Sequence, residues 1–467
     1  MTSCNRKFSL LTLCCASICL IWATTTLAMD HSMMIEGPFA SGPEVTETCL
    51  GCHFDAASQV MATSHWTWQL EQEIDGKTVT RGKVNAVNNF CVAIAANEPR
   101  CTSCHVGYGW EDSSFDFTDE TRVDCLVCHD TTGTYVKSPA GAGQPAPEVD
   151  LGKVAQSVGK SSRQSCGACH FFGGGGDAVK HGDLDSSIVN PTREIDVHMA
   201  ADGMNFTCTE CHTTENHKIS GHAMVVSPTG EDHIGCTSCH GDEPHRSPVL
   251  NRHYQAVACQ TCHIPEFAKE VATKTSWDWS TAGQDIPAEK DENGRPVYDK
   301  RKGHFTWGKN IQPTYKWYNG SAGAYQLGDK IDPAQVTELN YPLGDRKDLS
   351  AKIYPFKEHT AKQIYDTKNL YLITPKVFGK KGDTEAYWQG FDWNAAATAG
   401  MKASGLDYSG EYGFAPTTMY WRINHMVAPK NKALRCTDCH GSNNRLNWTE
   451  LGYSSDPMRD RSQTRHK

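Results

Sequence analysis

The pattern of hydrophobic and polar residues divides the chain into a short apolar segment and two long regions of different character. The apolar segment covers residues 8–22. Residues 29–263 are rich in Gly, Asp, Ser and Thr and have few long periodic segments, which predicts coil with short helices. In residues 264–435 we expect helices at 333–339, 384–404 and 416–427. The pattern therefore predicts a mainly α fold with much irregular coil.

The N-terminal apolar segment has the features of an export signal. It follows Arg6 and Lys7, and residues 26–28 (Thr-Leu-Ala) resemble a small-residue cleavage site. We therefore expect residues 1–28 to be removed as a signal peptide and the mature protein to lie in the periplasm. The alternative is an uncleaved anchor, but the segment is shorter than the roughly 20 residues that a spanning helix needs. Lipid attachment at Cys19 is disfavoured because Ile18 is not a small residue.

The cysteines follow one repeated motif. The chain has 21 cysteines, four of which belong to the expected signal peptide. In an oxidising compartment the default expectation for the rest is a disulfide framework. Sixteen of them instead form Cys-x-x-Cys-His, the signature of c-type haem attachment. We number the eight motifs along the chain: Cys49-Cys52-His53, Cys101-Cys104-His105, Cys125-Cys128-His129, Cys166-Cys169-His170, Cys208-Cys211-His212, Cys236-Cys239-His240, Cys259-Cys262-His263 and Cys436-Cys439-His440.

The motif has a direct chemical reading. Two cysteines three positions apart can each reach one vinyl group of a porphyrin, and the adjacent histidine can bind the iron. A zinc ribbon, a thioredoxin-like pair or a disulfide would explain one Cys-x-x-Cys, but not a histidine after all eight. The hydrophobic fraction of 38% is low for a chain of this length. We therefore expect eight covalently attached haem c groups to fill the interior as a packed array, in a multihaem cytochrome c fold.

Other histidines are candidates for the second axial position of each iron. Eleven lie away from the motifs and from the termini of the mature chain; His31 and His466 are set aside as too close to those termini. Four of the eleven are less well placed: His181, His217, His304 and His359. The seven best placed are His65, His198, His222, His233, His245, His253 and His425. An iron with two histidines passes electrons but has no free site, so an enzyme needs one haem that differs.

The region between the seventh and eighth motifs has a different character. Residues 29–263 hold seven motifs, and residues 436–467 hold the eighth motif and a tail. Residues 264–435 lack a motif but contain seven of the 12 tryptophans, and we expect them to be largely helical and to pack on the haem array. A partner-docking surface is the alternative reading of these aromatic residues. The net charge of -9, without a basic stripe, disfavours nucleic acid as a partner.

Two further features stand out. Directly after motif 4 the chain reads Gly-Gly-Gly-Gly-Asp-x-x-Lys-His-Gly-Asp, at residues 173–183. Glycine permits close approach of the backbone to a flat ligand, so this run could bring Asp177, Lys180 and His181 to a porphyrin; an ordinary flexible loop is the alternative. Cys91 is the one cysteine of the mature chain outside the motifs, and is either a functional thiol or a buried structural residue.

Taken together, these features resemble the octahaem tetrathionate reductase family. The resemblance rests on the eight motifs, the long gap before the eighth, the glycine run with Lys-His after motif 4, and a cysteine shortly before motif 2. It implies that Cys101 and Cys104 hold an active-site haem whose iron takes Lys180 in place of His105. It also implies that Asp177 and Cys91 line this site. Similar lysine ligation occurs in the pentahaem ammonia-forming nitrite reductases.

The resemblance implies a periplasmic respiratory reductase. Its substrate would be a small inorganic nitrogen or sulfur species such as tetrathionate, nitrite or hydroxylamine. Its electrons would come from a redox partner protein or a quinol-linked cytochrome. Two alternatives stay open: an electron carrier in which all eight haems have two histidines, and a hydroxylamine-oxidising enzyme with a tyrosine crosslinked to its haem.

Overall fold

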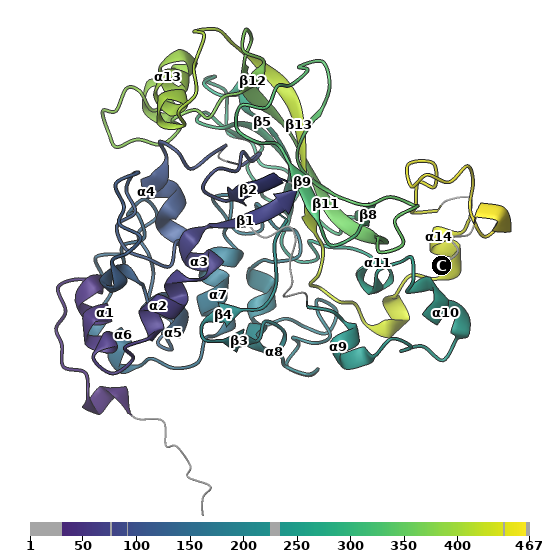
Figure 1. Ribbon diagram of the computed structural model, residues 1–467, viewed down its shortest axis with the longest axis horizontal. Helices are drawn as coiled ribbons and strands as arrows, with labels where there is room; N and C mark the ends of the chain where they lie inside the picture. Colours follow the sequence, from purple (N-terminus) through teal and green to yellow (C-terminus); the bar gives the residue numbers. More distant parts are fainter. Residues whose placement is uncertain (1–29, 75–76, 91, 225–233, 442–443, 464–467) are drawn as a thin grey trace, which may run out of the picture.

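The computed structural model describes residues 30–74, 77–90, 92–224, 234–441 and 444–463. The expected signal peptide, Cys91, His233 and His466 lie outside these residues. Short helices follow one another through the first half of the chain, and a large sheet occupies the second half (Figure 1). About 24% of the chain is helical and 20% is strand, so the expectation of a mainly α fold is not confirmed.

The first half contains eleven short α-helices and two small hairpins among the described residues. Several of the helices are the haem-attachment motifs themselves, which leaves little room for longer segments. The helices are α1 (Gly42–Leu50), α2 (Ala56–Met61), α3 (Ser64–Thr67), α4 (Glu98–Cys101), α5 (Leu126–His129), α6 (Leu151–Gln156), α7 (Arg163–His170), α8 (Cys208–Cys211), α9 (Thr237–His240), α10 (Pro248–His253) and α11 (Cys259–His263). The hairpins are β1 (Gln69–Ile74) with β2 (Lys77–Gly82), and β3 (Thr214–Glu215) with β4 (Lys218–Ile219).

The second half is built on a nine-stranded sheet rather than on helices. Seven strands lie in the order β6-β7-β5-β11-β13-β10-β9, and β8 and β12 pair with β11. The strands are β5 (Thr273–Asp278), β6 (Tyr298–Asp299), β7 (Gly303–Gly308), β8 (Thr314–Tyr318), β9 (Ala322–Ala324), β10 (Thr337–Pro342), β11 (Lys352–Asp366), β12 (Tyr371–Leu372) and β13 (Tyr412–Arg422). Three helices accompany them: α12 (Tyr387–Gly390), α13 (Trp393–Ala403) and α14 (Cys436–Cys439).

Two of the three helices predicted in this region are strands. Residues 416–427 fall largely in β13, which pairs antiparallel with β11 from Phe356↔Arg422 to Asp366↔Tyr412. The β-branched and aromatic residues of this segment favour an extended chain, and the partner strand is distant in sequence. Residues 333–339 form a turn at Asp332, whose carboxylate accepts from the Ala334 amide, and then enter β10. The expectation that residues 264–435 are largely helical is therefore wrong.

The third prediction is correct in outline. Residues 384–404 contain α12 and α13, separated at Phe391, which adopts a left-handed conformation (φ 53°). The Asp392 carboxylate accepts hydrogen bonds from the amides of Asn394 and Ala395 and begins α13. Gly405, at φ 70°, follows the end of this helix.

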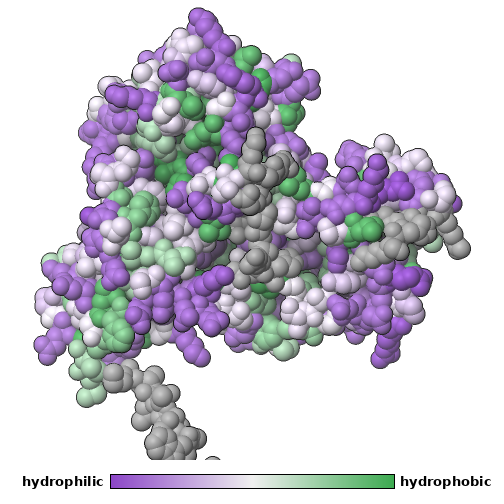
Figure 2. Space-filling view, viewed as in Figure 1, coloured by the Kyte–Doolittle hydropathy of each residue, from purple (hydrophilic) through white to green (hydrophobic). Residues whose placement is uncertain are grey.

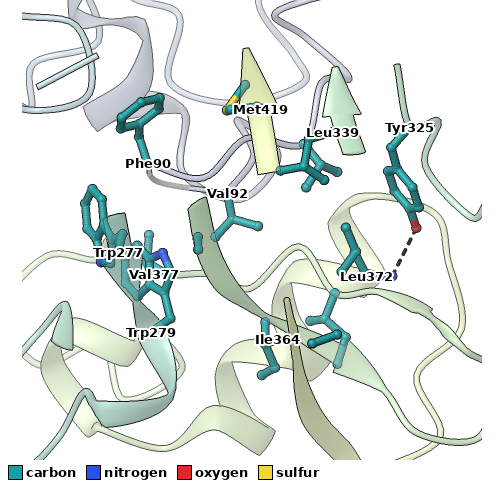
Figure 3. Packing of buried hydrophobic residues seen from close by; sticks show 14 of the residues in the cluster. Phe90, Val92, Trp277, Trp279, Tyr325, Leu339, Ile364, Leu372, Val377 and Met419 are labelled. Carbon is teal, nitrogen blue, oxygen red and sulfur yellow. Dashed lines mark hydrogen bonds between the residues drawn. The ribbon is translucent and has the colours of Figure 1, made fainter. Parts of the chain in front are cut away.

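The sheet and the first half of the chain share one hydrophobic core. Trp277, Trp279 and Met419 of the sheet region pack in a cluster with Phe90 and Val92, which come from the segment before motif 2 (Figure 3). Burying these side chains fixes that segment against the sheet. The face of the molecule shown in Figure 2 is mainly hydrophilic, with smaller hydrophobic patches. Within the described residues, no helix is both long and apolar enough to cross a membrane.

Candidate functional site

The sixteen motif cysteines, all within the described part of the chain, are not paired with one another in disulfides. Most of the motifs occupy a single helical turn, which places both thiols and the histidine around one short segment. The arrangement leaves every motif able to attach a haem, whereas a disulfide framework would have consumed the thiols.

Seven of the eight motif histidines face a second histidine. In each pair the ring centroids are 6.0–6.4 Å apart. A metal bound by two imidazoles, at roughly 2 Å from each nitrogen, separates the ring centres by about 6 Å, so each pair leaves room for one iron. The pairs are His53 with His31, His129 with His217, His170 with His65, His212 with His425, His240 with His198, His263 with His245 and His440 with His253.

The pairing includes five of the seven histidines predicted from the sequence to be distal ligands, and two that were not among them. His31 was set aside for its position near the terminus, but a short 3₁₀ helix capped by Asp30 carries it to His53. His217 sits in the tight β3–β4 turn at φ 61°, a conformation that gives no signal in the sequence. His222 lies elsewhere, where the Arg422 guanidinium donates to its Nε2 over 3.0 Å.

His105, in motif 2, is the exception among the described motif histidines. Its Nε2 is 2.7 Å from the backbone oxygen of Trp66. A carbonyl only accepts, so this nitrogen carries the proton and cannot also bind a metal. Burial lowers the pKa of His105 to about 3, so the ring is neutral. The aromatic rings that enclose it are Trp66, Trp68, Trp110, Phe115 and Phe117.

The glycine run after motif 4 shapes the backbone around Lys180. Gly174 has φ 80°, and a Cβ there would lie 2.9 Å from Val179 and 3.2 Å from Phe90. A Cβ on Gly173 would lie 3.2 Å from the Lys180 stem. Glycine is therefore required where the chain folds back over the lysine. The Lys180 Nζ lies 4.5 Å from the centroid of the Trp421 ring, on β13.

The other two residues proposed to line this site are less directly placed. The Asp177 carboxylate accepts hydrogen bonds from the amide (3.0 Å) and hydroxyl (2.5 Å) of Ser186. These bonds link the two ends of the loop of residues 177–186. Cys91 lies outside the described residues. Its neighbours Phe90 and Val92 are both 1% exposed.

Three buried nitrogen-bearing side chains lie around Phe90. The His359 ring is 4.5 Å from that phenyl ring, and the Lys357 Nζ is 5.9 Å from it. Lys274 is 4% exposed, with its Nζ 3.7 Å from the Trp277 ring that also contacts Phe90. Burial, and then the charges of Lys357 and Lys274, keep the pKa of His359 well below its usual value. Its Nε2 is buried without a hydrogen-bond partner among the described residues.

Known proteins resemble this chain in sequence and in fold. Residues 274–443 match the family model described as "Cytochrome c bacterial". An uncharacterised protein of Archaeoglobus fulgidus is 27% identical over 246 residues, which cover 42% of this chain and 82% of the relative. The crystal structure of an octahaem cytochrome c from Shewanella oneidensis is 57% identical, with a TM-score of 0.89, over 94% of this chain and all of that one. This chain is an octahaem c-type cytochrome. The eight motifs therefore hold eight covalently bound haem c groups.

The thiol positions give the order of the motifs in this octahaem cytochrome. Cysteines of motifs 1 and 3, 2 and 4, 4 and 5, and 6 and 7 lie side by side. Cysteines of motifs 3 and 4, 5 and 6, and 7 and 8 lie near one another as well. The motifs thus form a row 1-3-4-5-6-7-8, with motif 2 attached at motif 4. The helices of this row run across the lower part of Figure 1, from α1 to α14.

Carboxylates support two of the paired histidines. The Nδ1 of His440 lies 2.7 Å from Asp456, and that of His425 lies 3.1 Å from Asp183. Three other paired histidines face backbone oxygens instead: His129, His212 and His253. A carboxylate behind an imidazole makes the ring a stronger donor to a metal, which favours the oxidised state.

We therefore expect Asp456→Asn to raise the reduction potential of one haem, that of motif 8. The amide keeps the shape of the carboxylate but removes its charge. Potentiometric titration followed by absorbance should show one of the eight components shifted upward. Asp460→Asn is the matched control, because that carboxylate binds Ser462 and Gln463 rather than an imidazole. An unchanged titration of the Asp456 variant would contradict the assignment.

Proposed function

We propose that this octahaem cytochrome is a periplasmic respiratory reductase whose active-site haem is attached through Cys101 and Cys104 and ligated by Lys180. Its substrate would be a small nitrogen or sulfur oxo-species, such as tetrathionate, nitrite or hydroxylamine. The observation that carries the proposal is the exception at motif 2. There the Nε2 of His105 is hydrogen-bonded to the backbone oxygen of Trp66, whereas each of the other seven motif histidines faces a second histidine. The resemblance to octahaem tetrathionate reductases points to the same lysine.

When bound, the haems supply one-electron steps and, at the iron beside Lys180, a vacant position for the substrate. Lys180 would bind iron only as a neutral amine, because the lone pair that binds a metal carries the proton in the ammonium form. Gly173 covers its stem, and its Nζ lies 4.5 Å from the centroid of the Trp421 ring.

Buried nitrogen-bearing side chains lie beside the segment that precedes motif 2. Lys357 and His359 are fully buried and Lys274 nearly so. Burial keeps the pKa of Lys357 and of His359 well below their usual values, so these two groups do not select between an anionic and a neutral substrate. Acid–base assistance would come from His181, whose ring lies 5.1 Å from Trp421, and from Asp177 if Ser186 releases it.

Electrons would enter from a redox partner protein or a quinol-linked cytochrome at an end of the row of motifs. Cys52 in motif 1 and Cys436 in motif 8 are both exposed, so a haem edge at either end is open to a partner. The matching family model and the Shewanella oneidensis neighbour describe bacterial c-type cytochromes, which supports export to the periplasm. Removal of residues 1–28 as a signal peptide completes the proposal.

The test is oxidation of the reduced protein by substrate. Nitrite, tetrathionate and hydroxylamine are added side by side to anaerobic, fully reduced protein, and haem absorbance is followed. We expect rapid reoxidation by at least one of the three compounds. If none of the three compounds oxidises the protein faster than buffer does, the proposal is overturned in favour of an electron carrier.

A separate prediction concerns the thiol of Cys91. We expect Cys91→Ser to lower substrate turnover while haem content stays at eight, because the flanking residues Phe90 and Val92 are packed beside His359 and the sheet. Haem stoichiometry by pyridine haemochrome assay and turnover with the preferred substrate are the measurements. Full activity in the serine variant would make the thiol a structural residue only.

A further inference from the structure

Lys357 is a fully buried lysine whose amine is directed at the backbone that carries Lys180. It lies on β11, and its Nζ donates to the backbone oxygens of Val179 and Lys180, each over 3.0 Å. The same Nζ donates to the hydroxyl of Thr273 over 2.6 Å. All three donor positions of the amine are therefore used inside the protein.

Thr273, on the neighbouring strand β5, extends this network. Its hydroxyl is 2.6 Å from the backbone oxygen of Ala178 and 3.3 Å from that of His181. A hydroxyl has one proton, so Thr273 donates mainly to Ala178, and two side chains from adjacent strands satisfy the consecutive backbone oxygens of residues 178–180. Ala178 adopts φ 60°, which an alanine holds only when its surroundings enforce it.

The neighbouring strand β13 places an aromatic residue opposite Lys357. Lys357 is directly opposite Trp421 in the β11–β13 register. Residues opposite each other in antiparallel strands point to the same face, so this pair presents its amine and its indole together. The amine holds the backbone of Lys180, and the indole lies 4.5 Å from its Nζ.

Burying the Lys357 amine costs free energy of folding. In the described part of the chain no carboxylate is hydrogen-bonded to Lys357, and Asp183 acts on it only at longer range. A methionine or leucine would fill the same space without the penalty of burying a polar group. The need to hold the neighbouring backbone in position, rather than a gain in stability, accounts for a lysine at residue 357.

We infer that Lys357 and Thr273 are positioning residues that fix the 178–180 backbone, so that Lys180 reaches the iron of the haem at Cys101 and Cys104. This inference rests on the proposed function, because it assumes that Lys180 is a ligand. It predicts that loosening the backbone changes one haem and leaves the other seven unchanged.

The decisive comparison uses Lys357→Met, which keeps the length of the side chain but cannot donate. We expect eight attached haems, seven unchanged low-spin signals in paramagnetic resonance, an altered signal for the remaining haem, and turnover lower by about 100-fold. Lys362→Met is the matched control on the same strand, because that lysine is exposed and pairs with Asp278 at the surface. An unaltered spectrum in Lys357→Met would overturn the inference.

A second pair of variants covers a failure of Lys357→Met to fold. Thr273→Val removes the hydroxyl and Thr273→Ser retains it, so the valine variant should alter the same single haem signal and the serine variant should restore it. Equal spectra for the two Thr273 variants would also overturn the positioning role of Lys357 and Thr273. Lys180→Met is measured in parallel to test the ligand itself. If Lys180→Met alters the signal while the Lys357 and Thr273 variants do not, Lys180 remains the ligand and the positioning role is overturned. If Lys180→Met leaves the signal unchanged, Lys180 is not the ligand.

Discussion

Replacing Lys180 with leucine should abolish substrate reduction while leaving all eight haems attached. Leucine fills the space between Gly173 and Trp421 but offers no lone pair, so the iron beside it would lose its ligand. The motif histidine cannot take over, because the Nε2 of His105 is hydrogen-bonded to Trp66 inside an aromatic enclosure. Turnover with the preferred substrate and haem stoichiometry are measured on the same preparation, and we expect at least about a 100-fold loss of rate.

Lys160→Leu is the matched control for this experiment. Lys160 lies in the same half of the chain but is exposed, so its replacement should leave turnover unchanged. Turnover at the wild-type level in Lys180→Leu would remove this lysine from the mechanism. Loss of haems in Lys180→Leu would instead assign the lysine to maturation or folding.

Removing the imidazole of His217 should leave the haem iron of motif 3 with a free axial position. The ring of His217 faces His129 at 6.4 Å, and Gln59 supports its Nδ1 over 2.8 Å. In His217→Ala the haem of motif 3 would keep one axial histidine, so a second high-spin signal should appear in the spectrum of the oxidised protein. Paramagnetic resonance with spin counting makes the measurement.

His304→Ala is the control for that change. His304 is exposed and bonds to Thr281 rather than facing a motif histidine. Its removal should leave the spin count as in the wild type. If His217→Ala shows the wild-type spin count, the pairing of His217 with His129 does not describe ligation.

Attachment chemistry could be predicted from the sequence because it is local. Two cysteines and a histidine within five residues define a haem site wherever the chain carries them, and the motifs account for every described cysteine. The axial partners are not local. His217 lies 88 positions after His129 and His31 lies 22 before His53, so their pairing depends on how the helices and turns pack around the haems. Position near a terminus was a poor reason to set His31 aside.

The sheet could not be predicted for the same reason. The segment 416–427 has a proline near its start and is predicted to be a helix when considered alone. In the structure, residues 412–422 pair with β11 at eleven positions. Long-range strand pairing overrides the local preference. The error matters for the site, because β5, β11 and β13 supply Thr273, Lys357 and Trp421, which surround the 178–180 backbone. The glycine run pointed to Lys180, but nothing in the sequence pointed to the sheet that holds it.

The most direct test of a lysine-supported iron is the spin state of the oxidised protein at rest, counted against total haem. Seven facing histidine pairs and one excluded motif histidine predict seven low-spin haems, and an eighth whose signal changes on adding nitrite and is lost or altered in Lys180→Leu. Eight low-spin signals, all insensitive to added ligand and to replacement of Lys180, would contradict the account and leave a protein that only conducts electrons.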